Sequence, residues 1–434
     1  MFDRAIQAFR HKNYRLFFIG QGISLIGNWL TDVAMSWMVY RLTRDAGSGS
    51  AALWLGVVGF SEQIPMLVLA PLAGVFADRW DRRKIIIVTN IFSMLQSVAL
   101  AVLTFTHVIS IPQLIGLSVF QGIINSFEMP ARQAFLVEIV ERREDLPYAI
   151  ALNSSIFNGA RLVGPAIAGL LIAAVGEAIC FALDAVSYMA VIGSLLAMTI
   201  TRAPSTSKRL SPIREFNDGL SYAFGSPPIL TTLVFVGWIS FMTAAIMTLM
   251  PIFADRIGGI EHGARTLGFL MAAVGVGALC GGAYLATRKT VVGIGKVMVA
   301  AAMLLGSALI VFTLGKSFVW CEACLLAGGF GMILVMASGN TFLQSVVPDK
   351  KRGRVMSLYG TAVMGMAPFG SLLAGWLATR IGEPLTMIAA GACCLLAGGV
   401  FGALLPSLQK YVRPMYLERG IIASVVPEAV EMDD

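Results

Sequence analysis

The sequence predicts an all-α membrane protein in which twelve transmembrane helices form two pseudo-symmetric six-helix bundles. Three observations lead to this fold class: the composition, the recurrence of long uncharged runs, and the distribution of Lys and Arg between those runs. Hydrophobic residues make up 57% of the 434 residues and charged residues only 13%, about half the share typical of soluble domains. So few charges could not cover a soluble protein of this size, so lipid is the expected solvent.

Each predicted span is an apolar run of about 20 residues, the length that an α-helix needs to cross the hydrocarbon core. Some of these runs, mainly in the first half, also carry polar or charged residues. In chain order the expected spans are 16–40, 52–77, 85–106, 111–137, 147–175, 178–201, 229–254, 266–287, 297–315, 323–348, 355–379 and 385–409.

Positive charge gives the orientation, because short cytoplasmic loops are rich in Lys and Arg. With the N-terminus inside, the outside loops hold few of the 32 basic residues, namely Arg41, Arg44, Arg256, Arg265, Lys316 and Arg380. We therefore expect a multi-pass protein of the bacterial inner membrane with both termini in the cytoplasm. The net charge of +7 has the same origin, so no nucleic-acid partner is expected.

The longest inside loop, 202–227, is rich in Pro, Ser and basic residues and divides the spans into six and six. We expect an amphipathic segment at 1–15, bundles at 16–201 and 228–409, and a tail at 410–434. The halves repeat at a constant offset, because Gly159, Gly164, Gly169 and Gly176 align with Gly365, Gly370, Gly375 and Gly382. Such glycines let helices approach closely, which indicates duplicated bundles; packing without duplication is the alternative.

Four charged residues interrupt the apolar stretches of the first half: Asp32, Glu62, Arg161 and Asp184. A charge at bilayer depth costs at least about 2.5–3.5 kcal/mol, so such residues usually face a partner or a water-filled path. The second half has no comparable charge. The asymmetry predicts a transporter whose first half handles protons or charge and whose second half handles an apolar cargo. Asp184 is expected to make a structural hydrogen bond.

Gln21, Asn28 and Asp32 share one face of the first span, so this polar stripe should line a cavity. Asp32 lies near mid-depth, where poor solvation favours the protonated form, and we expect it to be the main proton carrier. A structural carboxylate held by Arg161 is the alternative. Glu62 is the second proton candidate, and Arg161 is expected to pair with Glu62 or Asp32.

The remaining cavity candidates lie on three other spans. Glu128 and Arg132, one turn apart in the fourth span, are expected to pair as an ion-pair gate or a cargo contact. Trp238 on the seventh span and Asn340 and Gln344 on the tenth are candidates for cargo contacts. Ordinary packing against lipid or core is the alternative for these three.

The segment between the second and third spans reads Gly74-Val-Phe-Ala-Asp78-Arg79-Trp-Asp81-Arg82-Arg83-Lys84. It resembles the signature loop of the major facilitator superfamily, with Asp81 in place of the usual second glycine. We expect a conformational latch formed by Gly74, Asp78, Arg79, Arg82 and Arg83. In it, Asp78 would meet the positive N-terminus of the eleventh span, and the arginines would pair with Glu138, Glu141 or Glu144. The alternative is that these basic residues only hold the loop on the cytoplasmic side, as the positive-inside rule predicts.

Two further segments are similar to the transmembrane secretion effector group, which includes the enterobactin exporter and macrolide efflux pumps. They are Met129–Ala134 and Asn158–Gly169. Within the second, Gly159, Gly164, Pro165 and Gly169 resemble the antiporter motif of exporters, without its closing double glycine. The resemblance implies secondary active export of amphiphilic small molecules, of drug or siderophore type, by proton antiport. The alternative is a lysophospholipid flippase of the same fold.

Enzymatic and ATP-driven functions have no support in the sequence. It contains neither a nucleophile–base constellation nor a metal-ligand set, and no phosphate-cradling G-x-x-x-x-G-K-[ST]. We therefore expect no enzyme activity and no cofactor. The expected partners are the small substrate, protons and membrane lipids, and the chain is expected to be a monomer.

Overall fold

The computed structural model describes residues 11–45, 50–140, 143–199, 220–288, 290–315 and 317–419. These residues form long α-helices and a short 3₁₀ turn, η1 (Arg143–Asp145), without a strand in the described ranges. Most of the expected amphipathic segment, most of the 202–227 loop and the end of the tail lie outside them. Ten helical segments are long and apolar enough to span a membrane, so the chain is a multi-pass membrane protein.

The helices fall into two consecutive sets. The first half contains α2 (Lys12–Asp45), α3 (Ala51–Arg79), α4 (Arg82–Phe105), α5 (Ile111–Ile139), α6 (Leu146–Val175) and α7 (Glu177–Leu196). The second half contains α9 (Pro227–Thr287), α10 (Ile294–Leu314), α11 (Phe318–Val346), α12 (Asp349–Ile381) and α13 (Glu383–Glu418). α9 is two helical segments joined at Gly259, whose φ of 68° breaks the helix in a conformation that glycine tolerates.

The prediction of twelve spans is not confirmed in full, because α2 and α5 are not among the ten apolar segments. Both carry polar side chains along their length, such as Asn28 and Asp32 in α2 and Gln121, Asn125 and Glu128 in α5. Both helices nevertheless pack against other helices of the first half. Polar side chains on an internal helix can face partners or water instead of lipid.

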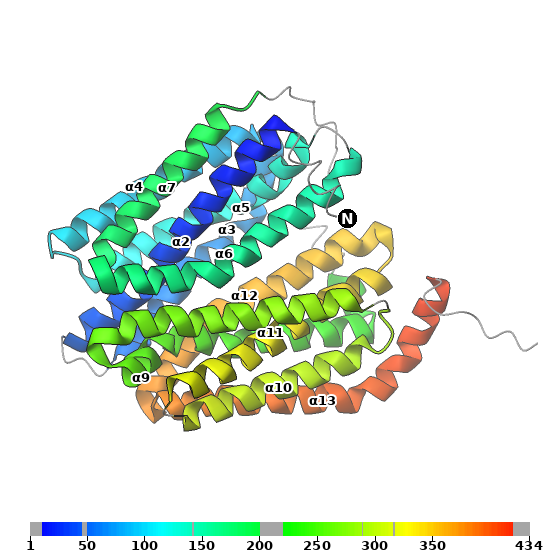
Figure 1. Ribbon diagram of the computed structural model, residues 1–434. Coiled ribbons are helices and arrows are strands. Elements are labelled where there is room, and N and C mark those ends of the chain that lie inside the picture. The colour runs from blue at the N-terminus through cyan, green and yellow to red at the C-terminus, as the bar shows by residue number, and fades with distance from the viewer. Residues whose placement is uncertain are drawn as a thin grey trace, which may run out of the picture.

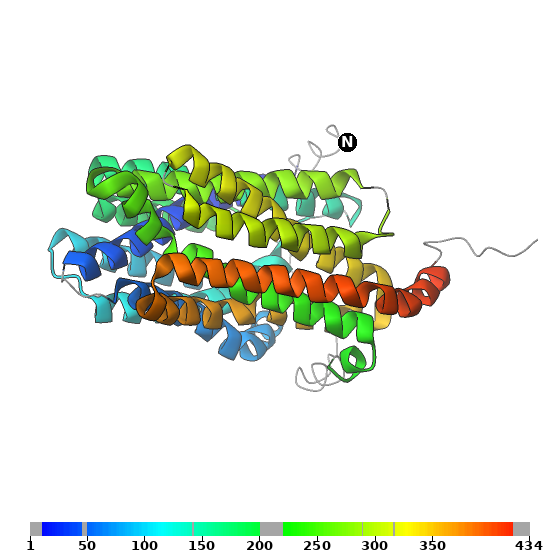
Figure 2. The same cartoon turned by 90° about the horizontal axis from the view of Figure 1, so that it is seen from below.

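Within each half the helices pack mainly with one another, and two helix pairs make most of the contact between the halves. α3 packs on α12, and α6 packs on α9. Figure 1 shows the first half, from blue to green, lying above the second half. Figure 2, the view from below, shows α13 running along the near face of the second half.

The glycine repeat corresponds to equivalent backbone positions in the two halves. Gly176 ends α6 with a φ of 82°, and Gly382 ends α12 with a φ of 86°. Gly169 of α6 lies against the backbone of Gly268 in α9, and Gly375 of α12 lies against the backbone around Gly56 in α3. The aligned glycines therefore make the same two kinds of contact, one at a helix end and one between the halves.

Candidate functional site

The middle of α2 exposes two opposite faces. Ile23 and Ile26 are 47% and 36% exposed on one face, and Asp32 is exposed on the other. Ile23 and Asp32 are nine residues apart, which at about 100° per residue places them on opposite sides of the helix. In a membrane the isoleucine face suits lipid, so the Asp32 carboxylate must face a water-filled space between helices.

Other acidic residues lie close to Asp32. Its carboxylate is within electrostatic range of Glu62 on α3 and Asp184 on α7. The expected ion pair of Arg161 with Glu62 or Asp32 is absent: no ion pair between described residues includes any of the three. Arg161 instead lies where α6 meets α9, with its backbone carbonyl against Gly275.

Asp184 differs from Asp32 because hydroxyl groups enclose it. It is 1% exposed. Thr31 and Ser97 donate to its Oδ2 at 2.7 and 2.8 Å, and Ser187 lies 3.3 Å from its Oδ1. The carboxylate thus joins α2, α4 and α7, which fits the structural hydrogen bond expected from the sequence.

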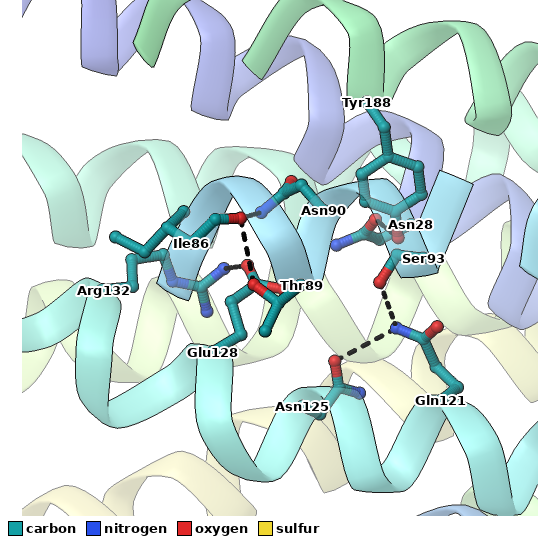
Figure 3. Close-up of polar contacts among 10 residues, drawn as sticks. All are labelled: Asn28, Ile86, Thr89, Asn90, Ser93, Gln121, Asn125, Glu128, Arg132 and Tyr188. Carbon is teal, nitrogen blue, oxygen red and sulfur yellow. Dashed lines mark hydrogen bonds and ion pairs between the residues drawn. The ribbon is translucent and has the colours of Figure 1, made fainter. Parts of the chain in front are cut away.

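A second polar network links four helices of the first half (Figure 3). The Tyr188 hydroxyl on α7 donates to Asn28 Oδ1 on α2 at 2.9 Å. On α5, Gln121 Nε2 donates to Ser93 of α4 at 3.2 Å and to Asn125 at 3.1 Å. Of these residues, only Asn28 is predicted from the sequence as a cavity residue. A polar stripe in the third span, repeated every three or four residues, was the signal that could have found them.

Glu128 and Arg132 form the ion pair that their helical spacing predicts. The Arg132 guanidinium lies 3.1 Å from Glu128 Oε1, and Glu128 is 9% exposed. The same guanidinium stacks over the ring of Phe157 on α6, 5.1 Å from its centroid. The pair therefore connects α5 to α6 as well as satisfying its own charges.

The arginines of the expected latch bind within the first half. Arg82 of α4 pairs with Glu138 of α5 at 2.5 Å, one of the partners that the sequence suggested. Arg83 donates to the carbonyl oxygen of Leu196 in α7. Asp81, the departure from the motif, accepts from the Lys84 amide and caps α4. These contacts do not join the two halves.

The remaining positions of the expected latch are Gly74, Asp78 and Arg79. The side chain of Asp78 lies outside the described residues. Arg79 is exposed, and a Cβ added at Gly74 would meet nothing within 4 Å. The expected contact between Asp78 and the N-terminus of α12 therefore stays a prediction.

The two halves touch on one side of the molecule and separate on the other. We call the side where α2 and α9 begin the termini side, and the side with the kink of α9 the far side. On the far side, Gly169 meets Gly268 and Gly375 meets Gly56. On the termini side, the corresponding faces are exposed and polar: Asn158 lies three turns before Gly169, and Ser357 five turns before Gly375. Figure 1 shows the halves diverging in this direction.

The glycines of the antiporter-like motif place α6 between two neighbours. Gly164 lies against the side chain of Trp29 in α2, and the Pro165 carbonyl lies against Gly268 in α9. Gly159, nearer the termini side, has open space where a Cβ would stand. Along α6, the residues of the motif therefore pass from open space at Gly159 to close contact with neighbouring helices at Gly164 and Pro165.

Of the cargo candidates in the second half, Asn340 and Gln344 lie together on α11. Gln344 Nε2 donates to Asn340 Oδ1 at 2.5 Å, and Gln344 is exposed. Tyr359 of α12 donates to the carbonyl of Met336, one turn before Asn340. Asn340 and Gln344 lie in the part of α11 toward the termini side, where this helix ends.

Trp238 lies on a different face of the second half. It is 41% exposed and lies one turn from Val234, which is 62% exposed. Val236, two residues from each, packs against Gly339 of α11, and two residues on a helix differ by about 200°. Trp238 therefore points away from α11, as a lipid-facing residue does, and the expectation that it shares a cavity with Asn340 has no support in the structure.

Comparison with known proteins identifies the family. The sequence model of the transmembrane secretion effector family matches residues 4–412. The chain is 26% identical over 362 residues to the staphyloferrin A transporter of Staphylococcus aureus, covering 83% of this chain and 88% of that protein. It is 27% identical over 400 residues to the multidrug efflux pump Tap of Mycolicibacterium fortuitum, covering 88% and 93%.

Two further similarities agree with this family. The enterobactin exporter EntS of Shigella boydii is 24% identical over 406 residues, covering 92% of this chain and 94% of that protein. A bacterial homologue of the human lysosomal transporter Spinster, solved inward-facing and occupied, superposes with a TM-score of 0.73 at 13% identity, covering 92% and 98%. That likeness shows the fold. Because the family model spans most of its length, the chain belongs to the transmembrane secretion effector family of major facilitator transporters and is not an enzyme.

Proposed function

We propose that the chain is a secondary active exporter that exchanges protons for amphiphilic small molecules of drug or siderophore type. The observation that carries the proposal is the exposed Asp32 carboxylate in the middle of α2, on the face opposite the lipid-facing isoleucines. Relatives named as siderophore transporters and a multidrug efflux pump support the cargo class.

Asp32 has the two properties that a proton carrier needs, namely access to water and freedom from a permanent counter-charge. No ion pair between described residues includes it, and its side chain is exposed. Asp184 lacks the first property, because it is 1% exposed and three hydroxyls surround it in a sealed site. Glu62 is the second proton site in this proposal, and Arg161 offers a counter-charge to an ionised carboxylate when the halves approach.

In this proposal, the separation of the halves corresponds to one state of the transport cycle. If the termini side is cytoplasmic, as the distribution of Lys and Arg predicts, this state opens toward the bacterial cytoplasm and receives cargo there. The two halves would then rock about the membrane midplane to open the far side. In this proposal the latch at Gly74, Asp78, Arg79, Arg82 and Arg83 joins the halves when the termini side closes.

Cargo would contact both halves within the opening. Asn340 and Gln344 offer amides from the second half, and the Glu128–Arg132 pair offers a partly buried charge pair from the first. Amides and paired charges bind polar groups of a cargo without requiring one net charge. Such a site suits amphiphilic molecules of varied shape.

The test is uptake of a compound panel, including ethidium and a catecholate siderophore, into inside-out membrane vesicles with an imposed proton gradient. We expect gradient-driven uptake by the wild type and a loss of at least about tenfold for Asp32→Asn, since the main protonation site of the proposal is removed. Glu261→Gln, which neutralises an exposed carboxylate at the far side, is the matched control and should transport normally. Full gradient-driven uptake by Asp32→Asn would overturn the proposal.

The flippase alternative is tested in the same vesicles with a fluorescent lysophospholipid. None of the three relatives described above is named as a lipid transporter. Movement of the lysophospholipid without movement of any compound in the panel would favour the flippase over the exporter.

A further inference from the structure

The side-chain bonds that join described residues of the two halves converge on one carboxylate at the far side. The Tyr40 hydroxyl on α2 donates to Asp255 Oδ2 on α9 at 2.8 Å, and Arg44 of α2 lies 3.2 Å from Asp255 Oδ1. Of the side-chain hydrogen bonds and ion pairs identified between described residues, these two alone cross from one half to the other. Asp255 is thus the shared acceptor of both crossing bonds.

These bonds lie in a packed environment. Tyr40 is 7% exposed and the Asp255 side chain 16%. Trp37, one turn before Tyr40, lies 5.5 Å from its ring and reaches over Gly263 in α9, where no side chain stands in its way. Shielding from water strengthens a hydrogen bond to a charged acceptor. The arrangement is therefore more than a surface ion pair.

Each bonding segment is also anchored to its own half. Arg41, next to Tyr40, pairs with Glu177 of α7 at 3.1 Å. Arg256, next to Asp255, pairs with Glu383 of α13 at 3.1 Å. Because each segment is held by its own bundle, the bonds to Asp255 connect the two halves themselves. They do not merely connect two loose helix ends.

We propose that Asp255, Tyr40 and Arg44 form a lock that holds the far side shut, and that both bonds break each time this side opens. The inference rests on the alternating access proposed above, because a lock has a role only if the far side opens. α2 carries Asp32 in its middle and the lock at its end. A movement of this one helix therefore reaches the proton site and the lock together.

The lock is tested by hydrogen–deuterium exchange of the full-length protein in lipid nanodiscs, without cargo or proton gradient. In Asp255→Ala, amide exchange at the far-side ends of α2 and α9 should rise about tenfold, because two bonds to one carboxylate are lost. The termini-side parts of α6 and α12 should become more protected at the same time. Tyr40→Phe, which removes one oxygen atom, should shift both regions in the same directions and less strongly.

Glu261→Gln is the matched control, since it neutralises an exposed carboxylate on the same side that no ion pair between described residues includes. Its exchange on the termini side should equal that of the wild type. The charge swap Arg44→Asp with Asp255→Arg should move the exchange pattern back toward the wild type. If Asp255→Ala does not fold, Tyr40→Phe decides the question.

Unchanged exchange on both sides in Asp255→Ala and Tyr40→Phe, each with a normal melting transition, would overturn the lock. The experiment involves no proton coupling. A shift in exchange combined with unimpaired gradient-driven transport by Asp32→Asn would therefore leave the lock in place and remove the proposed proton exchange. Unchanged exchange in the lock variants, combined with lost gradient-driven transport by Asp32→Asn, would remove the lock and leave the proposed proton exchange in place.

Discussion

The two halves bury different kinds of polar side chain. The first half buries acids and amides as well as hydroxyls, among them Gln21, Asn90, Gln96, Glu128 and Asp184. In the described second half, the buried polar residues are all Ser and Thr: Ser226, Thr232, Ser240, Thr243, Thr248, Thr266, Ser338, Ser371 and Thr386. Chemistry that can hold or exchange charge is therefore concentrated in one bundle.

The partners of these groups differ as well. In the second half, Thr232, Thr243 and Thr248 donate to carbonyls of their own helix one turn earlier. In the first half, Thr31 and Ser97 donate across helices to Asp184. Polar groups thus help to decide which helices meet in the first half, while most of those in the second half could be removed without loss of a bond between helices. One fold can therefore join its helices through side-chain hydrogen bonds in one bundle and mainly through apolar packing in the other.

The largest effect is expected for Asp184→Ala, which removes the acceptor shared by hydroxyls of three helices. Hydroxyls left buried without a partner carry the full cost of lost solvation. We expect a loss of about 4 kcal/mol in unfolding free energy, measured by denaturant titration in detergent micelles. A loss below about 1 kcal/mol would show that the polar framework is not what stabilises the first half.

A matched pair of serines sharpens the comparison. Ser97 and Ser338 are both 0% exposed, but Ser97 donates to Asp184 and the Ser338 hydroxyl has no hydrogen-bond partner among the described residues. Ser97→Ala should cost about 2 kcal/mol, the contribution of a hydrogen bond to a charged group, and Ser338→Ala should cost nothing or stabilise. Equal losses of unfolding free energy for the two substitutions in the same titration would show that buried hydroxyls contribute alike in both halves.

The smallest expected effect concerns cargo. Gln344→Ala should raise the apparent KM for a transported compound about threefold, because one hydrogen bond of about 0.5–1.5 kcal/mol is lost. Trp238→Ala should change the KM less than twofold, since its side chain faces away from α11. Initial rates of uptake into vesicles over a range of cargo concentrations measure both. A larger rise in the KM for Trp238→Ala than for Gln344→Ala would indicate that Trp238 lines the cargo cavity.

Local patterns in the sequence predicted local contacts well. The spacing of Glu128 and Arg132 predicts an ion pair on one helix, and the structure contains it. The glycine repeat, too, leads to equivalent contacts of α6 and α12. Such predictions succeed because helical geometry alone brings residues three or four positions apart together.

Contacts between distant segments could not be predicted in this way. Asp255 lies more than two hundred residues from Tyr40 and Arg44, and no spacing rule relates them. Similar depth also suggested a partner for Arg161, yet depth does not say which face of which helix a side chain occupies. The side to which Trp238 points could not be predicted for the same reason, because its residue type is compatible with a cavity and with lipid.

The most direct test of the account is whether Asp32 exchanges a proton with water. Infrared difference spectra of the reconstituted protein between acidic and alkaline pH report the C=O stretch of protonated carboxyl groups. We expect one component of the carboxyl band of the wild type to be lost in Asp32→Asn and retained in Glu261→Gln, while other carboxyl groups such as Glu62 keep the rest of the band. A band of undiminished intensity in Asp32→Asn would contradict the central claim that this residue carries the proton.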